Sequence, residues 1–305
     1  MGHQYGRRGK APKGAGECAL SRLFAPFRFS SPMTRRFLVL AWSAAACTYL
    51  LIVLGAVVRI TGSGMGCGDH WPLCNGHLFP PLNDIGTVIE WSHRLVAALV
   101  SILVIALASY DWWLNRPSSR PAGRPSFIAV ALLVIQILLG AVTVKLELPA
   151  WSVVLHLGTA MLLLATLLVA ARPHPLTPSP FGRRGTRLLV TLTFVTVLFG
   201  ALTANLGAAA ACHGFPLCNG EIWISAGPLA LIHWVHRLLA YALAIVATVW
   251  AVRTPGKASK IVLGLIVLQI AVGAGTVLSG LASGLQAAHV AVGTAVWAGV
   301  VLANR

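Results

Sequence analysis

The chain has 305 residues, of which 57% are hydrophobic and 10% are charged, whereas a soluble domain usually carries about a quarter charged residues. This composition excludes an ordinary water-soluble enzyme, a disordered protein and a small secreted domain held together by disulfides. The 23 Lys and Arg residues against 7 Asp and Glu give a formal net charge of +16. Because the basic residues lie between long apolar runs, a membrane explains this charge better than a nucleic acid does.

Several apolar stretches are long enough to cross a bilayer as helices, since a transmembrane helix needs roughly 20 apolar residues. Eight stretches qualify, and in chain order they cover residues 37–58, 88–114, 127–146, 152–171, 188–208, 228–250, 261–281 and 286–303. All of them are far too long for the strands of a membrane barrel. The sequence therefore predicts an all-α polytopic membrane protein with eight transmembrane helices.

The basic residues gather on one side of the predicted membrane. They precede the first span, follow the second, fourth and sixth spans and end the chain, whereas Arg59 and Lys145 lie at helix edges on the opposite side. By the positive-inside rule, both termini face the cytoplasm and the loops 60–87 and 209–227 face outward. This places the chain in a bacterial inner membrane, or alternatively in the mitochondrial inner membrane with its termini in the matrix.

Two segments are predicted to connect rather than to span. Residues 1–33 are rich in Gly and Arg, which predicts a disordered basic tail on the cytoplasmic side. Residues 172–187 contain Pro, Ser and several Arg, which predicts a flexible cytoplasmic linker. These segments leave an N-terminal half, residues 34–171, and a C-terminal half, residues 188–305.

The two halves repeat each other. The matching segments are CGDHWPLCNG (67–76) with CHGFPLCNG (212–220), EWSHRLVA (90–97) with HWVHRLLA (233–240), and QILLGAVTV (136–144) with QIAVGAGTV (269–277). Because each half has an even number of predicted spans, both halves have the same orientation, related by a pseudo-twofold axis along the membrane normal. We therefore expect two parallel-repeat four-helix bundles with equivalent sites.

Histidines inside the spans are candidate functional residues, because an ionisable side chain at membrane depth is costly. His93 and His236 are equivalent and open the second helix of each half, while His156 and His289 open the fourth. All four are expected at one depth, toward the outer face. Two imidazoles on separate helices can bind a haem iron from both faces, which predicts one haem site in each half. The alternatives are neutral imidazoles bonded to neighbouring helices, or zinc, which requires further ligands.

The repeat breaks at one acidic position. Glu90 lies one turn before His93, whereas His233 takes its place in the other half, without an evident role. Arg94 follows Glu90 by four residues and can pair with it; alternatively, Arg94 and Arg237 each meet a haem propionate, whose carboxylate matches a guanidinium. An acid beside only one haem site suggests that this site performs chemistry while the other carries electrons.

Two pairs of cysteines lie in the predicted outer loops. They are Cys67 with Cys74 in the first loop and Cys212 with Cys218 in its repeat. The outer face of a bacterial membrane is oxidising, which favours a disulfide within each loop. The alternative in the first loop is a zinc ion bound by its cysteines with His70 and His77. Whether such disulfides are structural or redox-active stays open.

Together these features resemble haem A synthase. The resemblance covers about residues 34–303, and Glu90-x2-His93-Arg94, the CGDHWPLC loop and their repeat carry it, while the paired cysteines resemble the bacterial branch of the family. The resemblance implies oxidation of the C8 methyl group of haem O to a formyl group, in two successive two-electron steps, to make haem A for terminal oxidases. It also implies that His93 and His156 bind the substrate haem, that His236 and His289 ligate a haem b cofactor, and that Glu90 acts at the methyl group.

The resemblance implies partners as well. They are haem O as substrate, haem O synthase, an electron acceptor such as quinone, and membrane lipid, with no nucleic acid. Three other functions fit the same residues: a bis-histidine di-haem b cytochrome that only transfers electrons, a quinone-coupled generator of disulfides that uses the loop cysteines, and a carrier that releases haem O unaltered.

Overall fold

The computed structural model describes residues 35–81, 83–115, 124–172, 180–222 and 227–304. Within these ranges the fold consists of eight long α-helices and two short 3-10 helices. The long helices are α1 (Arg35–Ile60), α2 (Ile85–Asn115), α3 (Arg124–Lys145), α4 (Ala150–Ala170), α5 (Pro180–Asn205), α6 (Pro228–Arg253), α7 (Lys257–Leu278) and α8 (Ser283–Ala303). The 3-10 helices η2 (Ser63–Met65) and η3 (Ala208–Ala211) follow α1 and α5.

All eight long helices have the length and the apolar composition needed to cross a membrane. The chain is therefore a polytopic all-α membrane protein, and the predicted fold class is confirmed. Apart from α5, each helix begins and ends within about one turn of the span predicted for it. The predicted basic tail, residues 1–33, lies outside the described residues.

The start of α5 differs most from the prediction. The helix begins at Pro180 instead of residue 188, so the end of the predicted linker 172–187 is helical, while residues 173–179 lie outside the described ranges. Proline suits the first turn of a helix because its missing N–H would have no partner there. A search for apolar runs ends a span at the edge of the hydrocarbon core, whereas a helix can continue beyond that edge.

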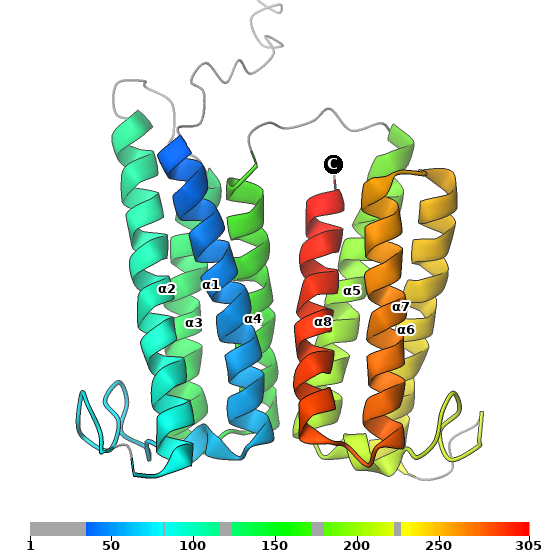
Figure 1. The fold of residues 1–305 in the computed structure, drawn as a ribbon, viewed down its shortest axis with the longest axis horizontal. Coiled ribbons are helices and arrows are strands. Elements are labelled where there is room, and N and C mark those ends of the chain that lie inside the picture. Colours follow the sequence, from blue (N-terminus) through cyan, green and yellow to red (C-terminus); the bar gives the residue numbers. More distant parts are fainter. Residues whose placement is uncertain (1–34, 82, 116–123, 173–179, 223–226, 305) are drawn as a thin grey trace, which may run out of the picture. The chain divides into compact units, whose positions relative to one another are not determined.

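The helices pack as two four-helix groups that lie side by side. Figure 1 shows α1–α4 in blue to green and α5–α8 in light green to red, with the loops after α1 and α5 at the same end of both groups. Within the groups, α1 packs on α2, α3 on α4, α5 on α6 and α7 on α8; between them, α4 contacts α5 and α8, and α1 contacts α8. The described residues form one compact unit.

Small residues allow close helix contacts inside the protein. Ala41, Ala44 and Ala45 of α1 are almost fully buried, as is typical where membrane helices approach each other closely. Large apolar side chains such as Leu50 and Ile102 are instead mostly exposed. This distribution suits helices whose outer faces contact lipid tails.

Two side chains tie the halves together through backbone carbonyls. The Tyr49 hydroxyl of α1 donates to the carbonyl of Ala291 on α8 at 2.8 Å. The indole N–H of Trp297 on α8 donates to the carbonyl of Met161 on α4 at 2.8 Å. Because tyrosine and tryptophan usually need a hydrogen-bond partner when buried, these contacts fix how α8 packs against α1 and α4.

Candidate functional site

Both outer loops are closed by the predicted disulfides. Cys67 and Cys74 are bonded, with their Cα atoms 4.4 Å apart, and so are Cys212 and Cys218, at 4.8 Å. The cysteine pairs are therefore confirmed. Because its two sulfurs are bonded to each other, the first loop does not supply the thiolates that the alternative zinc site requires. Among the described residues, no group of three or more His, Cys, Asp or Glu side chains could hold a metal ion.

The arginine that follows each helix-opening histidine holds a loop in place. Arg94 donates to the backbone carbonyls of His70 at 2.7 Å and Leu73 at 2.5 Å. Arg237 donates to the carbonyls of Cys212 at 3.0 Å, Gly214 at 2.9 Å and Leu217 at 2.8 Å. Each guanidinium therefore tethers a disulfide loop to α2 or α6; within the described residues only loop carbonyls accept from Arg237, whereas Arg94 donates to the loop through Nη1 alone.

Glu90 is buried and joins α2 to the first loop. Its side chain is 5% exposed. One carboxylate oxygen accepts the backbone N–H of Cys67 at 2.8 Å, and the other accepts two N–H groups of Arg94, at 3.2 and 2.5 Å. The structure thus brings Glu90 and Arg94 together as a partly buried ion pair, one of the two arrangements expected for Arg94.

The equivalent position in α6 is an imidazole with a different partner. His233 is buried, and its Nδ1 lies 3.1 Å from the carbonyl of Ala208 in η3. Glu90 therefore connects α2 to the segment after α1, and His233 connects α6 to the segment after α5. Only the N-terminal half does so with a carboxylate, so α2 and α6 carry different groups at this position in otherwise similar surroundings.

Each of the four predicted haem ligands lies against a glycine of the preceding helix. A Cβ atom built on Gly55, Gly140, Gly200 or Gly273 would lie 3.1, 3.3, 2.9 or 2.9 Å from the Cε1 atom of His93, His156, His236 or His289, respectively. Carbon atoms prefer separations of about 3.5–4.0 Å. The missing side chain of each glycine therefore gives the imidazole its place against the neighbouring helix.

Two glutamines complete this arrangement in α3 and α7. The amide nitrogen of Gln136 lies 3.1 Å from Nε2 of His156, and that of Gln269 lies 3.2 Å from Nε2 of His289. The repeated segments 136–144 and 269–277 begin with these glutamines, but the repeat alone assigns them no role. A signal existed, because each lies four residues before the glycine that contacts the same histidine, on one face of its helix.

Buried polar atoms without partners recur at equivalent positions in both halves. Nδ1 of all four histidines and the amide oxygens of both glutamines are buried and lack a hydrogen-bond partner within the described residues. An unsatisfied buried polar group costs about 1–3 kcal/mol. Because this free-energy cost recurs at matched positions of both halves, these polar groups are more consistent with binding sites than with a role in stability.

The rings of the second histidine pair lie close together. The ring centroids of His236 and His289 are 6.4 Å apart, and the rings are nearly perpendicular. A bond from a metal ion to an imidazole nitrogen is about 2.0–2.1 Å long, so this separation is compatible with one ion bound by a nitrogen of each ring. Two imidazoles from opposite helices, in an apolar bundle, match the axial ligand set of a haem iron.

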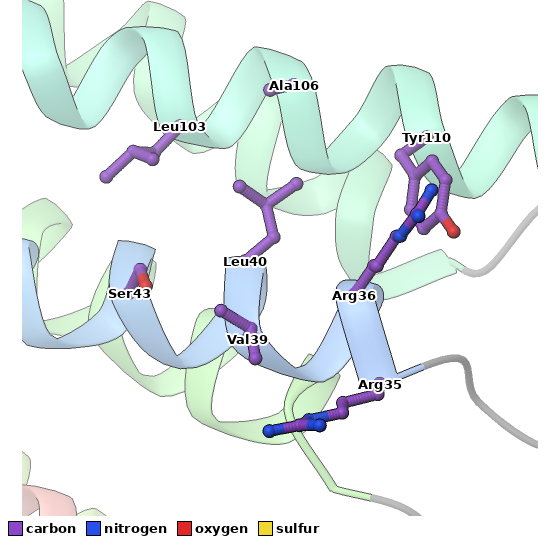
Figure 2. A pocket seen from close by; sticks show the side chains of 8 residues that line it. All are labelled: Arg35, Arg36, Val39, Leu40, Ser43, Leu103, Ala106 and Tyr110. Carbon is purple, nitrogen blue, oxygen red and sulfur yellow. The ribbon is translucent and has the colours of Figure 1, made fainter.

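An apolar groove elsewhere in the N-terminal half is separate from these sites. It has a volume of about 710 Å³ and lies between α1 and α2. Figure 2 shows its lining, with Leu103, Ala106 and Tyr110 of α2 across from Leu40 of α1. The groove lies toward the opposite ends of these helices from Gly55 and His93, and no histidine or carboxylate lines it.

Comparisons with known proteins identify relatives of almost the whole membrane-spanning part of the chain. The COX15-CtaA family model, described as cytochrome oxidase assembly protein, matches residues 38–87 and 83–301, which contain every candidate site residue. The "Heme A synthase" of Bacillus licheniformis is 36% identical over 262 residues, covering 78% of this chain and 85% of that protein. The "Heme A synthase" of Alkalihalophilus pseudofirmus is 39% identical over 204 residues (62% and 67%), and that of Bacillus pumilus is 33% identical over 266 residues (79% and 85%).

Proposed function

This chain belongs to the COX15-CtaA family of cytochrome oxidase assembly proteins, and on that premise we propose that it is a haem A synthase. The reaction oxidises the C8 methyl group of haem O to a formyl group in two successive two-electron steps. With an external acceptor for the electrons, one water supplies the formyl oxygen, and four protons and four electrons are released in all. The duplicated histidine pairs carry this proposal, because two like sites that differ in one acid suit one substrate and one electron carrier. The relatives named heme A synthase support it.

The two histidine pairs take different roles in this proposal. His93 and His156 bind the substrate haem O, with Glu90 beside them. His236 and His289 hold a haem b cofactor, which supplies electron transfer when bound. The separation of the His236 and His289 rings and the unpartnered Nδ1 atoms support the second site. The matching contacts of His93 with Gly55 and of His156 with Gly140 support the first.

Glu90 acts through its negative charge at the substrate site. Three N–H groups donate to its carboxylate, and those of Arg94 are charge-assisted. This arrangement holds the ionised group in a fixed place one turn from His93, where it stabilises positive charge that develops as the methyl carbon is oxidised. The same carboxylate can accept a proton released at that carbon if it lies within hydrogen-bond reach.

Replacing Glu90 tests this assignment. The Glu90→Gln variant keeps the shape of the side chain but lacks its charge, so we expect it to retain bound haem and to lose most haem A formation. The assay is pigment extraction after co-expression with a source of haem O. Glu147→Gln, an exposed carboxyl change at the end of α3, is the control. Unchanged haem A formation in Glu90→Gln would falsify the role of Glu90.

The other functions make different predictions for the same extract. An electron-transfer cytochrome or a haem carrier yields no formylated haem from the unmodified chain. A disulfide generator loses its function when Cys67 and Cys74 are replaced by Ser, while its haem spectrum stays intact. The difference between Glu90 and His233 at equivalent positions favours the synthase over a cytochrome with two equal haems.

We also propose the setting in which the protein works. It lies in the bacterial inner membrane with both termini in the cytoplasm, since the basic residues gather on the side of the termini. The haem sites then lie near the outer face. Haem O synthase supplies its substrate, and a quinone or a similar acceptor removes the electrons. A reporter that is active only in the cytoplasm, fused after residue 305, tests the orientation. We expect the fusion to be active; an inactive fusion, together with activity of a second reporter that works only outside the membrane, would contradict the proposal.

A further inference from the structure

Arg59 joins the two halves at the loop end of the bundle, which is the end that carries the two disulfide loops. It lies in the last turn of α1, and its Nη2 donates to the amide oxygen of Gln286 on α8 at 3.1 Å. Gln286 is itself held, because its amide nitrogen donates to the carbonyl of Leu281 at 2.5 Å. The guanidinium of Arg59 is therefore positioned by a residue of the other half.

Among the described residues, Arg59 is the loop-end guanidinium with the fewest side-chain hydrogen bonds. Arg94 pairs with Glu90, and Lys145 lies 3.5 Å from a carboxylate oxygen of Asp69. The guanidinium of Arg237 is taken up by three loop carbonyls. Arg59 is half-buried, and its one side-chain hydrogen bond goes to the neutral amide of Gln286. A guanidinium has five N–H donors, so most of its capacity is unused.

Arg59 also lies near a candidate haem ligand of each half. On α1 it follows Gly55 by four residues, and Gly55 packs on the ring of His93. On α8 its partner Gln286 precedes His289 by three residues. Residues three or four apart share a helix face. The cation is therefore just outward of the histidine sites, at the end where the chain meets polar surroundings.

We propose that Arg59 binds a carboxylate of the tetrapyrrole held by His93 and His156, with Gln286 as its positioning residue. The proposal rests on the proposed function, since it requires a tetrapyrrole in the N-terminal site. A guanidinium binds a carboxylate through two parallel hydrogen bonds, and the fork of Arg59 has the free donors to form them. Arg59 belongs to α1, which packs on α2 and on the ring of His93, so its ligand is the one in the N-terminal half.

The N-terminal site can be tested alone in the full chain. In a His236→Ala, His289→Ala background, the purified haem-free protein is titrated with haemin and with haemin dimethyl ester, which lacks both carboxylate charges. We expect Arg59→Gln to weaken haemin binding by roughly tenfold to a hundredfold, the range for hydrogen bonds to charged groups. The same change should leave binding of the ester almost unaltered. Arg59→Lys keeps the charge and should retain part of the preference for haemin.

Controls separate this inference from the proposed function. Lys145→Gln removes another loop-end cation and should leave both titrations unchanged. If Arg59→Gln binds haemin as tightly as the parent, or weakens haemin and its ester equally, Arg59 does not bind a carboxylate and the inference fails alone. If the parent background binds neither compound, or if adding His93→Ala and His156→Ala leaves binding intact, the proposed substrate site fails and the inference fails with it.

Discussion

Replacing the glycines that contact the imidazoles should damage haem binding although alanine favours helices. At Gly273 in α7, an added Cβ would lie 2.9 Å from Cε1 and 3.3 Å from Nδ1 of His289. To restore a contact of about 3.5 Å or more, the imidazole must move by roughly half an ångström. Overpacking of this kind costs about 1–3 kcal/mol. Without a bound haem, the ring of His289 cannot move freely, because the amide nitrogen of Gln269 lies within hydrogen-bond distance of its Nε2 atom.

The same helix provides a matched control. Gly264 of α7 has open space where its Cβ would lie, so Gly264→Ala should stabilise the protein by about 0.4–1 kcal/mol through a less flexible unfolded chain. Gly273→Ala gains the same stabilisation through the unfolded chain, but it displaces the ring of His289. We expect its affinity for haemin to fall by roughly tenfold, since 1.4 kcal/mol is a factor of ten in affinity. The affinity of Gly264→Ala should stay that of the parent.

Spectroscopy distinguishes displacement of the ligand from general damage. The assay is a Soret titration of each purified variant, together with the electron paramagnetic resonance signal of the low-spin iron, which responds to the orientation of the axial rings. Gly200→Ala, whose Cβ would lie 2.9 Å from Cε1 of His236, should behave like Gly273→Ala. The reasoning is refuted if Gly273→Ala and Gly264→Ala have the same haemin affinity and the same resonance signal.

Three further changes test contacts around the sites. Gln269→Leu removes the hydrogen bond to Nε2 of His289. Because a bound haem iron would hold this ring itself, the melting temperature should fall more without haemin than with it; an equal fall in both scans would contradict the argument. Replacing Cys67 and Cys74 by Ser removes the bond that closes the loop whose residue 67 N–H donates to Glu90. Glu90 should then be held less firmly, so extracted pigment should contain less haem A while the haem b spectrum persists, and unchanged haem A would show that the disulfide does not position Glu90. Arg237→Gln leaves loop carbonyls of the second half without their donor, so limited proteolysis should cut residues 212–220 faster than in the parent, and an equal rate would refute the tether.

The sequence predicted the spans because length and apolar composition alone determine which helices can cross a bilayer. It could not place the start of α5, because residues 180–187 include three arginines and two glycines, so the apolar run begins only after them. The disulfides were predictable because spacing within a short outer loop and the redox conditions outside the cell suffice. None of these inferences required knowledge of which side chains meet.

Contacts between helices were beyond the sequence. The segments that begin at Gln136 and Gln269 were recognised as repeats, but only packing reveals that Gln269 and Gly273 face the same imidazole. The sequence offered Arg94 and Arg237 as partners for propionates or for an acid. It could not show the loop carbonyls that occupy them, because a fold determines which backbone acceptors lack a helix or sheet partner.

The duplicated scaffold explains how one bundle can hold two similar groups for different tasks. Each half supplies the same ring contacts with glycine, the same loop tether and the same Gln–His bond, so the geometry around both sites is set by shared elements. The differences then act on charge rather than on shape. Glu90 in place of His233 puts a carboxylate beside one site, and Arg59 adds an incompletely paired cation near the same site. A difference in reactivity between the two sites would therefore arise from electrostatics, which single substitutions at Glu90 and Arg59 can alter while the ligand geometry stays intact.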